Sequence, residues 1–245
     1  MDENTVTWNQ LLQQSHKKNH KSIVYVQMTN LRRNGEPSLH NIRFHDFVKD
    51  DSRYLLFLMA FNDNQLHGDV KSNPNAQLCW QMQTTKEIYN LSGRFYIVSS
   101  PKKITRFPPP KSSNPDMPTQ ESWETVRRQV WSALSSQTRA MFTWPPSGEI
   151  PKSGKAAFKC LKLDSMLDDH IGSDGSDRVD HEVAFDNFCL LIFKVNEVIR
   201  FEYGSFPPKR TLYRLDDDYD DEEGLAFIWT INPSLSRIAC IDLMS

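Results

Sequence analysis

Two histidines and an arginine lie close together in a short β-branched and aromatic segment, where they could hold an anion. The segment reads His40-Asn41-Ile42-Arg43-Phe44-His45. In an extended strand Asn41, Arg43 and His45 share one face. His40 lies on the opposite face, with the apolar side chains. An arginine beside a histidine on an exposed face can bind a phosphate or a carboxylate. The alternative is an ordinary solvated strand face, which the spacing alone favours.

The other polar clusters support fewer kinds of chemistry. The nine glycines never form a Gly-x-Gly-x-x-Gly or Walker pattern, which excludes a Rossmann or P-loop nucleotide site. Ser147 precedes Gly148 without the Gly-x-Ser-x-Gly elbow of a hydrolase. Residues 168–181 hold several aspartates and two histidines, but they lack the ordered ligand positions of an EF-hand. We therefore predict no metal site.

The composition limits the compartment and the partners. The chain has 245 residues, a formal net charge of −2 and a pI near 6.4. This balance predicts neither nucleic acid nor an acidic membrane surface as a partner. No apolar run approaches the ~20 residues of a membrane span, and residues 1–8 lack a signal-peptide core. We expect a soluble protein of the cytoplasm, with the nucleus as an alternative compartment.

The cysteines lie far apart in apolar segments and form no Cys-x-x-Cys pair. They are Cys79, Cys160, Cys189 and Cys240. This pattern predicts buried free thiols rather than disulfides or metal ligands.

The first hundred residues predict one helix followed by a meander of strands. Residues 5–16 place Trp8, Leu12 and Ser15 on one helical face, with Thr5 or Thr7 available as the N-cap. Asn34-Gly35 predicts a tight hairpin turn. Strands are predicted at 23–29, 38–44, 53–61, 76–82 and 88–98. Short connections imply antiparallel pairing, and closure into a barrel removes the exposed edges.

An amphipathic stretch from Trp123 to Gly148 is expected to pack helices against the sheet. Trp123, Val130 and Leu134 keep helical spacing, with Trp131 beside them. The residues predicted to face away are Glu124, Arg127, Arg128 and Gln129. Ser135 or Ser136 can end this helix and cap a second turn that carries Arg139, Met141 and Phe142. Pro145 and Pro146 prevent continuation of the helix.

The remaining segments complete one predicted domain over residues 1–245. A proline-rich stretch at 101–120 is interpreted as an ordered extended crossing, with an interdomain linker as the alternative. Residues 164–181 are expected to form a polar loop, and the acidic run 216–223 a solvated hairpin tip. Further strands are predicted at 188–193, 197–203, 210–215 and 225–231.

Several motifs together resemble the pyridoxamine 5′-phosphate oxidase-like flavin proteins. The first half carries Pro37, Ile42, Phe44 and Phe47, then Asn73-Pro-Asn-Ala-Gln-Leu-Cys-Trp80, then Leu91-Ser-Gly-Arg94. A helix-plus-stop element of one subfamily is matched by Arg127, Trp131, Leu134, Ser135, Arg139, Phe142, Trp144, Pro145 and Gly148. Similar positions near the end are Asn187 to Leu191, Arg210, Trp229 and Pro233. The resemblance covers nearly the whole chain.

The resemblance implies a mainly β fold with flanking helices (α+β), an antiparallel split β-barrel of the FMN-binding type. It also implies a homodimer with FMN across the interface and, where there is turnover, an FMN-dependent oxidoreductase acting on a small molecule. The helix-plus-stop element identifies the family without supplying a flavin-binding residue. The cofactor-binding positions that it implies are His40, Asn41, Arg43, His45, Asn62, Asp63, Asn64, Lys71 and Arg94, with a loop at 62–69.

The chain departs from the family pattern where the flavin phosphate is usually bound. Histidines stand at positions 40 and 45 in place of arginines, and residues 60–68 contain no arginine, lysine or serine. Residues 88–93 lack the usual glutamine and arginine. Charge-assisted hydrogen bonds contribute ~1.5–3 kcal/mol each, so losing several weakens phosphate binding strongly. The alternative hypothesis is a cofactor-free family member that acts as a non-catalytic binding or scaffold protein.

Overall fold

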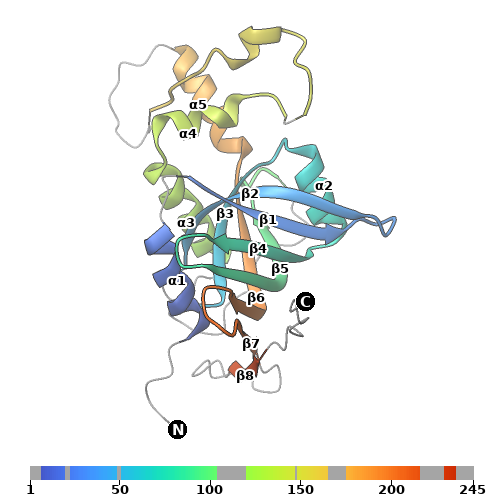
Figure 1. The fold of residues 1–245 in the computed structure, drawn as a ribbon. Coiled ribbons are helices and arrows are strands. Elements are labelled where there is room, and N and C mark those ends of the chain that lie inside the picture. Colours follow the sequence, from blue (N-terminus) through green and yellow to red (C-terminus); the bar gives the residue numbers. More distant parts are fainter. Residues whose placement is uncertain are drawn as a thin grey trace, which may run out of the picture.

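Antiparallel strands that close on themselves form the centre of the protein (Figure 1). The computed structural model describes residues 7–19, 23–48, 51–103, 120–146, 148–164, 175–215 and 229–235. Its strands are β1 (Val24–Leu31), β2 (Pro37–Phe47), β3 (Tyr54–Ala60), β4 (Asn75–Met82), β5 (Glu87–Val98), β6 (Phe188–Glu202), β7 (Lys209–Leu215) and β8 (Trp229–Leu235). The order is β3-β2-β1-β4-β5-β6, and β3 also pairs with β6, which closes a barrel of six strands. The predicted antiparallel barrel is confirmed.

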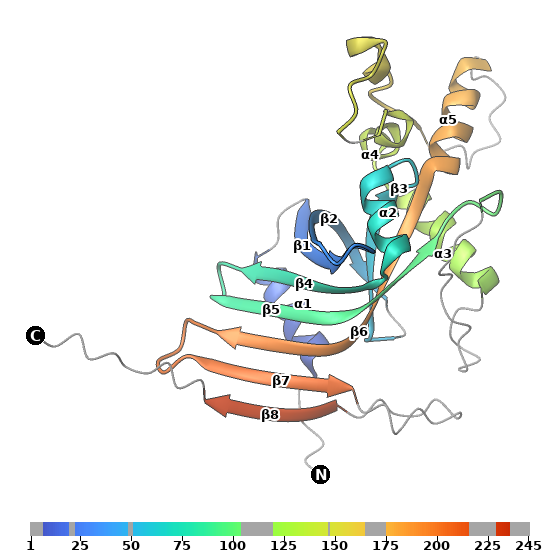
Figure 2. The same cartoon turned by 90° about the vertical axis from the view of Figure 1, so that its right-hand side faces the viewer.

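The long strand β6 splits the sheet. Its first half pairs with β3 from Phe188 to Lys194, and its second half pairs with β7 from Glu197 to Glu202. Figure 2 shows β7 and β8 extending the sheet beyond the barrel. A bulge at Ser92/Gly93 bends β5 along β6. A Cβ at Gly93 would meet the Lys194 carbonyl oxygen at 2.1 Å, so only glycine permits this close approach.

The barrel interior holds the first hydrophobic core, which the helix α1 (Trp8–Asn19) completes. Trp8 and Leu12 are buried with the inward side chains of the strands. Thr7 and Gln10 form a reciprocal cap, in which the Gln10 amide donates to Thr7 Oγ1 at 3.3 Å and the Thr7 amide donates to Gln10 Oε1 at 2.9 Å. The helix predicted at the start of the chain is confirmed and extends to Asn19.

A second core lies between the outer face of the barrel and a layer of helices. The helices are α3 (Gln120–Ala133), α4 (Ser136–Ala140), η1 (Met141–Thr143), η2 (Gly154–Phe158) and α5 (Gly175–Asn187). Trp123, Trp131 and Phe142 pack there against β3 and β6. Residues 54–59 of β3 are therefore buried on both faces, as their unbroken apolar run predicts. Figures 1 and 2 show α4 and α5 at one end of the molecule and β7 and β8 at the other.

Local capping explains why the helical layer breaks at Ser135. The Ser135 side chain accepts a hydrogen bond from the Thr138 amide at 3.2 Å, which begins α4. Arg139 then donates to main-chain carbonyls at the end of α3, including that of Trp131 at 3.3 Å. The predicted cap and second helical turn are confirmed.

Three predictions about surface segments are wrong. Arg127 does not face solvent but is fully buried, because Glu124 and two main-chain carbonyls satisfy its guanidinium. The stretch at 62–69 is not a loop, since α2 (Asn64–Ser72) begins there with Asp63 as its N-cap. The polar segment 164–181 is not wholly a loop, because α5 begins at Gly175.

Smaller corrections concern strands and cysteines. The last strand starts at Trp229 and continues through Pro233, because it lies beside β7 at the edge of the paired strands. The three described cysteines are free, but Cys79 is exposed because it lies on the outward side of β4. Cys160 is partly exposed, and Cys189 is buried as predicted. Most of the crossing 101–120, the acidic run 216–223 and Cys240 lie outside the described residues, and the single-domain organisation stays a prediction.

Within the described ranges, no helix is long and apolar enough to cross a membrane. In the same ranges no three histidine, cysteine, aspartate or glutamate side chains gather closely enough to hold a metal ion.

Candidate functional site

A groove with a volume of about 360 Å³ lies between the barrel and the helical layer. Strands β2 and β3 form its floor, and the start of α2 forms one side. The segment from α4 to Phe158 forms the other side. The lining residues are Tyr25, Asn41, Ile42, Arg43, Leu58, Met59, Ala60, Asn62, Asp63, Leu66, Thr138, Met141, Phe142, Trp144, Pro145, Pro146, Gly148, Glu149 and Phe158.

Arg43 brings the cationic charge into the groove. It lies on the outward side of β2, and its Nη2 donates to Thr138 Oγ1 at 3.3 Å. Thr138 is itself held by Ser135 at the start of α4. Among the lining residues that the structure describes, Arg43 is the only lysine or arginine. An anionic group in the groove would therefore depend on this guanidinium.

The segment between β3 and α2 joins the two sides of the groove. The Asn62 amide donates to Asn187 Oδ1 at 2.9 Å, and Asn62 Nδ2 donates to the Trp144 carbonyl at 3.1 Å. Asn64 Nδ2 donates to Glu149 Oε1 at 3.1 Å. Asp63 Oδ1 accepts from the Leu66 amide at 3.0 Å, which caps α2. These bonds fix the position of the Asp63 carboxylate beside the groove.

The Trp-Pro-Pro element forms the opposite wall. Trp144 Nε1 donates to the Cys160 carbonyl at 2.8 Å, and its ring lies edge-on to Phe158 with centroids 5.6 Å apart. Gly148 has a φ of +82°, which side-chain-bearing residues rarely adopt. The helix-plus-stop element therefore contributes directly to the site, contrary to the expectation that it identifies the fold alone.

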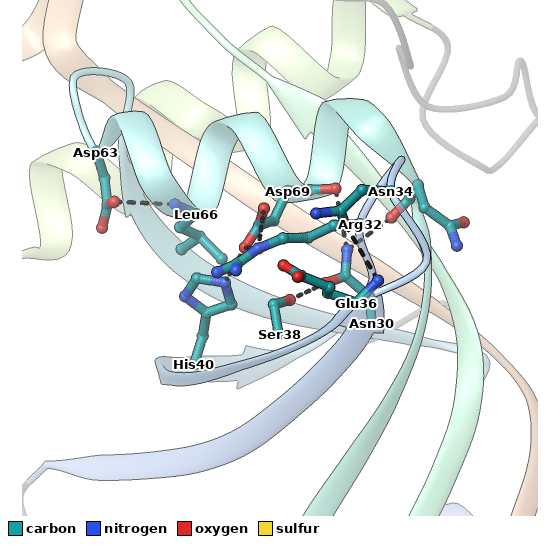
Figure 3. A network of polar contacts seen from close by, with 10 residues as sticks. Asn30, Arg32, Asn34, Glu36, Ser38, His40, Asp63, Leu66 and Asp69 are labelled. Atoms are coloured by element: carbon teal, nitrogen blue, oxygen red, sulfur yellow. Dashed lines mark hydrogen bonds and ion pairs between the residues drawn. The ribbon is translucent and has the colours of Figure 1, made fainter.

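His40 belongs to a polar network on the other side of β2 (Figure 3). Its Nε2 lies 2.9 Å from Asp69 Oδ2, and Arg32 Nε lies 3.1 Å from Asp69 Oδ1. Burial alone would raise the pKa of Asp69, but hydrogen bonds from His40 and Arg32 together lower it below its usual value of 3.8. His40 is thus committed to holding α2 against the β1–β2 hairpin and does not line the groove.

The other predicted positions separate into two groups. Asn41, Arg43, Asn62 and Asp63 line one groove, whereas His40, His45, Asn64, Lys71 and Arg94 do not. Burial lowers the pKa of His45, and the charge of Arg43 lowers it further, so its imidazole is neutral near pH 7.

Asn64 does not line the groove, but its side chain donates a hydrogen bond to Glu149, which does. Lys71 is exposed in the last turn of α2, and the Arg94 guanidinium lies 5.8 Å from the Tyr96 ring centroid.

Sequence reasoning missed Thr138, Trp144 and Glu149 as lining residues. The position of Trp144 could have been predicted, because the prolines of Trp-Pro-Pro end the helix and the chain must then turn back over the sheet. Thr138 and Glu149 carried none, since they meet Arg43 and Asn64 only through the tertiary fold.

Comparison with known proteins relates this architecture to a family. No family model matches the chain. Pyridoxine/pyridoxamine 5′-phosphate oxidase 2 of Arabidopsis thaliana is 24% identical over 176 residues, covering 67% of this chain and 74% of the relative. A pyridoxamine 5′-phosphate oxidase-related, FMN-binding protein from Nostoc punctiforme superposes with a TM-score of 0.67. The chain has the split-barrel fold of these pyridoxamine 5′-phosphate oxidase-related proteins.

The structural likeness extends over nearly the whole chain. The Nostoc protein shares 20% sequence identity, and the match covers 94% of this chain and 98% of that one. PhzG from Burkholderia lata, solved in complex with tetrahydrophenazine-1-carboxylic acid, has a TM-score of 0.53 at 12% identity, covering 92% and 88% of the two chains. At these identities the likeness concerns the split-barrel fold.

The Nostoc protein is named as FMN-binding, and the groove of this chain suits the ring system of FMN better than its phosphate. Tyr25, Met141 and Phe158 are exposed in the groove and offer apolar surface for a planar ring system. The side-chain amides of Asn41 and Asn62 can meet polar ring edges. A phosphate, in contrast, would meet one guanidinium and two carboxylates. The described lining residues therefore fit a flavin ring and do not fit a phosphate.

Proposed function

We propose that the protein binds a flavin, FMN or a related one, in the groove between β2, β3 and the Trp144–Glu149 segment. The observation that carries this proposal is the convergence of Asn41, Arg43, Asn62 and Asp63 on one cavity. These residues come from two separate elements, and the family resemblance implies them as flavin-binding positions. The groove volume of about 360 Å³ lies within the range of small-molecule sites.

The chemistry of a bound flavin is oxidation or reduction of a small molecule, and we propose an oxidoreductase of this kind. The chain would supply position and electrostatics. Met141 and Phe158 would exclude water from one side of the ring, and Asn41 and Asn62 would orient its polar edge. The Arabidopsis relative is named as an oxidase of pyridoxine and pyridoxamine 5′-phosphate, which supports a small heterocyclic substrate class.

We further propose that the protein is a homodimer in which the β1–β2 face meets its copy. Large apolar side chains are exposed on this face, with Leu39 at 70% and Tyr25 at 52%. Tyr25 pairs in register with Arg43 and also lines the groove, so the apolar face continues into the site. A second copy covering this face would close the groove.

A groove-filling variant tests the proposed site. In Asn41→Trp an indole is placed in the groove from an exposed strand position that tolerates aromatic residues. We expect the wild-type protein to bind FMN and riboflavin and to quench their fluorescence. The Asn41→Trp variant should not bind them, so their fluorescence should stay unchanged. Lys209→Trp, on exposed β7, controls for the added indole. Equal quenching by both variants, or none by the wild type, contradicts the proposal.

The second candidate, a cofactor-free binding or scaffold protein, is favoured by the commitment of His40 to Asp69 and by the two carboxylates in the groove. Micromolar or tighter FMN binding that is lost in an Arg43→Ala His45→Ala double variant would remove its basis.

A further inference from the structure

The groove carries more negative than positive charge. Asp63 and Glu149 both line it, and Arg43 opposes them as the single guanidinium among its described lining residues. We infer that the groove selects a flavin without a terminal phosphate, so that riboflavin binds more tightly than FMN. This inference rests on the proposed flavin binding and specifies the ligand of the same site.

Asp63 occupies the place where an anion would otherwise bind. The N-terminus of α2 faces the groove, and helix N-termini attract phosphates through their free amides and dipole. Here the Asp63 carboxylate accepts from the Leu66 amide at 3.0 Å, and the Asp63 carbonyl accepts from the His67 amide at 2.9 Å. The chain's own carboxylate therefore fills the anion position and repels a second anion.

Glu149 adds a second negative charge on the facing wall. Its Oε1 accepts from Asn64 Nδ2 at 3.1 Å, which holds the carboxylate beside the start of α2. A phosphate monoester carries a charge of about −1.5 to −2 near pH 7. Any phosphate placed at this end of the groove would meet both carboxylates at once.

Among the described residues that line the groove, no second lysine or arginine supplies further positive charge. Arg43 already donates to Thr138 Oγ1, and Arg32 and His40 are paired with Asp69 behind β2. Burial lowers the pKa of His67, as do the charges of nearby lysines, so its ring is neutral near pH 7. Lys103 lies 4.1 Å from the Phe61 ring centroid and does not line the groove.

The test is a pair of titrations with riboflavin and FMN at low ionic strength, followed by flavin fluorescence on the intact protein. We expect the dissociation constant for FMN to be about tenfold higher than that for riboflavin in the wild type. In Asp63→Asn Glu149→Gln the ratio of the two dissociation constants should fall towards one, because FMN binding tightens more than riboflavin binding changes. Asparagine is an equally good N-cap, so α2 should survive the change.

Two controls make the result specific. Glu36→Gln removes an exposed carboxylate from the β1–β2 hairpin and should leave the ratio unchanged. Melting curves followed by circular dichroism check that the double variant is folded. If FMN binds the wild type as tightly as riboflavin does, or more tightly, the inference is overturned. The proposed function, flavin binding, would still hold in that case. Binding of neither flavin overturns the proposed function as well.

Discussion

Arg43 decides whether the groove can hold any anionic or strongly polar ligand edge. Its guanidinium donates through Nη2 to Thr138 Oγ1 at 3.3 Å, and its other donors can serve a ligand. We expect Arg43→Gln to weaken flavin binding about tenfold, since hydrogen bonds to charged groups contribute ~1.5–3 kcal/mol. Arg33→Gln, in the exposed hairpin, is the matched control. A titration that gives equal affinities for both variants would exclude Arg43 from the site.

Asp69 makes the stability of the protein depend on pH in the acid range. Its pKa is lowered in the folded state, so its contribution is present above the unfolded value near 3.8 and is lost as the pH falls through the folded value. We expect Asp69→Asn to lose about 1–3 kcal/mol of unfolding free energy at pH 7.

Urea denaturation measured from pH 7 downwards checks this prediction. The difference between the wild type and Asp69→Asn should shrink as the pH falls below 3.8, where Asp69 is first protonated in the unfolded state and then, below its lower folded pKa, in both states. The unfolding free energy of Asp46→Asn, at an exposed position, should change with pH in parallel with that of the wild type. A difference for Asp69→Asn that stays constant down to pH 2 would mean that the carboxylate charge does not stabilise the fold.

At the scale of residues, sequence predicted the site in part. Asn41 and Arg43 follow from strand alternation, because a period of two places both outward. His40 could not be assigned, since its partner Asp69 lies 29 positions away on a helix that was not predicted. Thr138 is 95 positions from Arg43, and no local pattern connects them.

The helix α3 depends on a buried ion pair rather than on its apolar stripe alone. Arg127 is fully buried, pairs with Glu124 at 2.7 Å, and donates to the carbonyls of Phe185 and Phe188. Its guanidinium also lies 4.0 Å from the Phe185 ring centroid. We expect Arg127→Met to destabilise the protein by about 3–5 kcal/mol, because the two main-chain carbonyls lose their buried donor and Glu124 keeps only the exposed Arg128 as a partner.

The adjacent Arg128 provides the comparison for this prediction. It also pairs with Glu124, but its side chain is 61% exposed. Arg128→Met should therefore cost less than about 1 kcal/mol. Equal losses for the two variants in urea denaturation would show that burial of Arg127 does not stabilise α3.

At the scale of elements, sequence predicted the features that depend on a few adjacent residues. Asn34-Gly35 predicted its hairpin, where Gly35 has a φ of +83°, and Ser135 predicted the break in the helical layer. The helix α2 was missed because few apolar residues mark its face, chiefly Leu66 and Val70 at a spacing of four. The start of α5 was missed for a similar reason, since Gly175 and Ser176 read as loop.

At the scale of the whole molecule, the outward face of β1 and β2 exposes the apolar side chains of Tyr25, Leu31 and Leu39. If β1 and β2 meet a second copy, a lysine at Leu39 should disrupt the assembly, because Leu39 is 70% exposed on that face. We expect wild type to elute as a dimer and Leu39→Lys as a monomer in chromatography with light scattering. Phe206→Lys, which is 96% exposed in the β6–β7 connection, should stay dimeric. A monomeric wild type would contradict the proposed dimer.

Fold and ligand are separable in this chain. Gly93 packed against Lys194 and Arg127 packed against Phe185 position the backbone and the helical layer. The proposed ligand would meet a different set of residues, Arg43, Asp63 and Glu149. Changes in these charges could therefore alter the flavin that the groove accepts without altering the fold.

The most direct test of flavin binding is the visible absorption spectrum of the purified protein after equilibration with excess riboflavin or FMN and removal of free ligand. We predict flavin bands that stay with the wild-type protein, with more riboflavin than FMN retained, and no bands with Asn41→Trp. A wild-type protein that is colourless after both treatments, with an unchanged melting temperature, would contradict flavin binding in the groove.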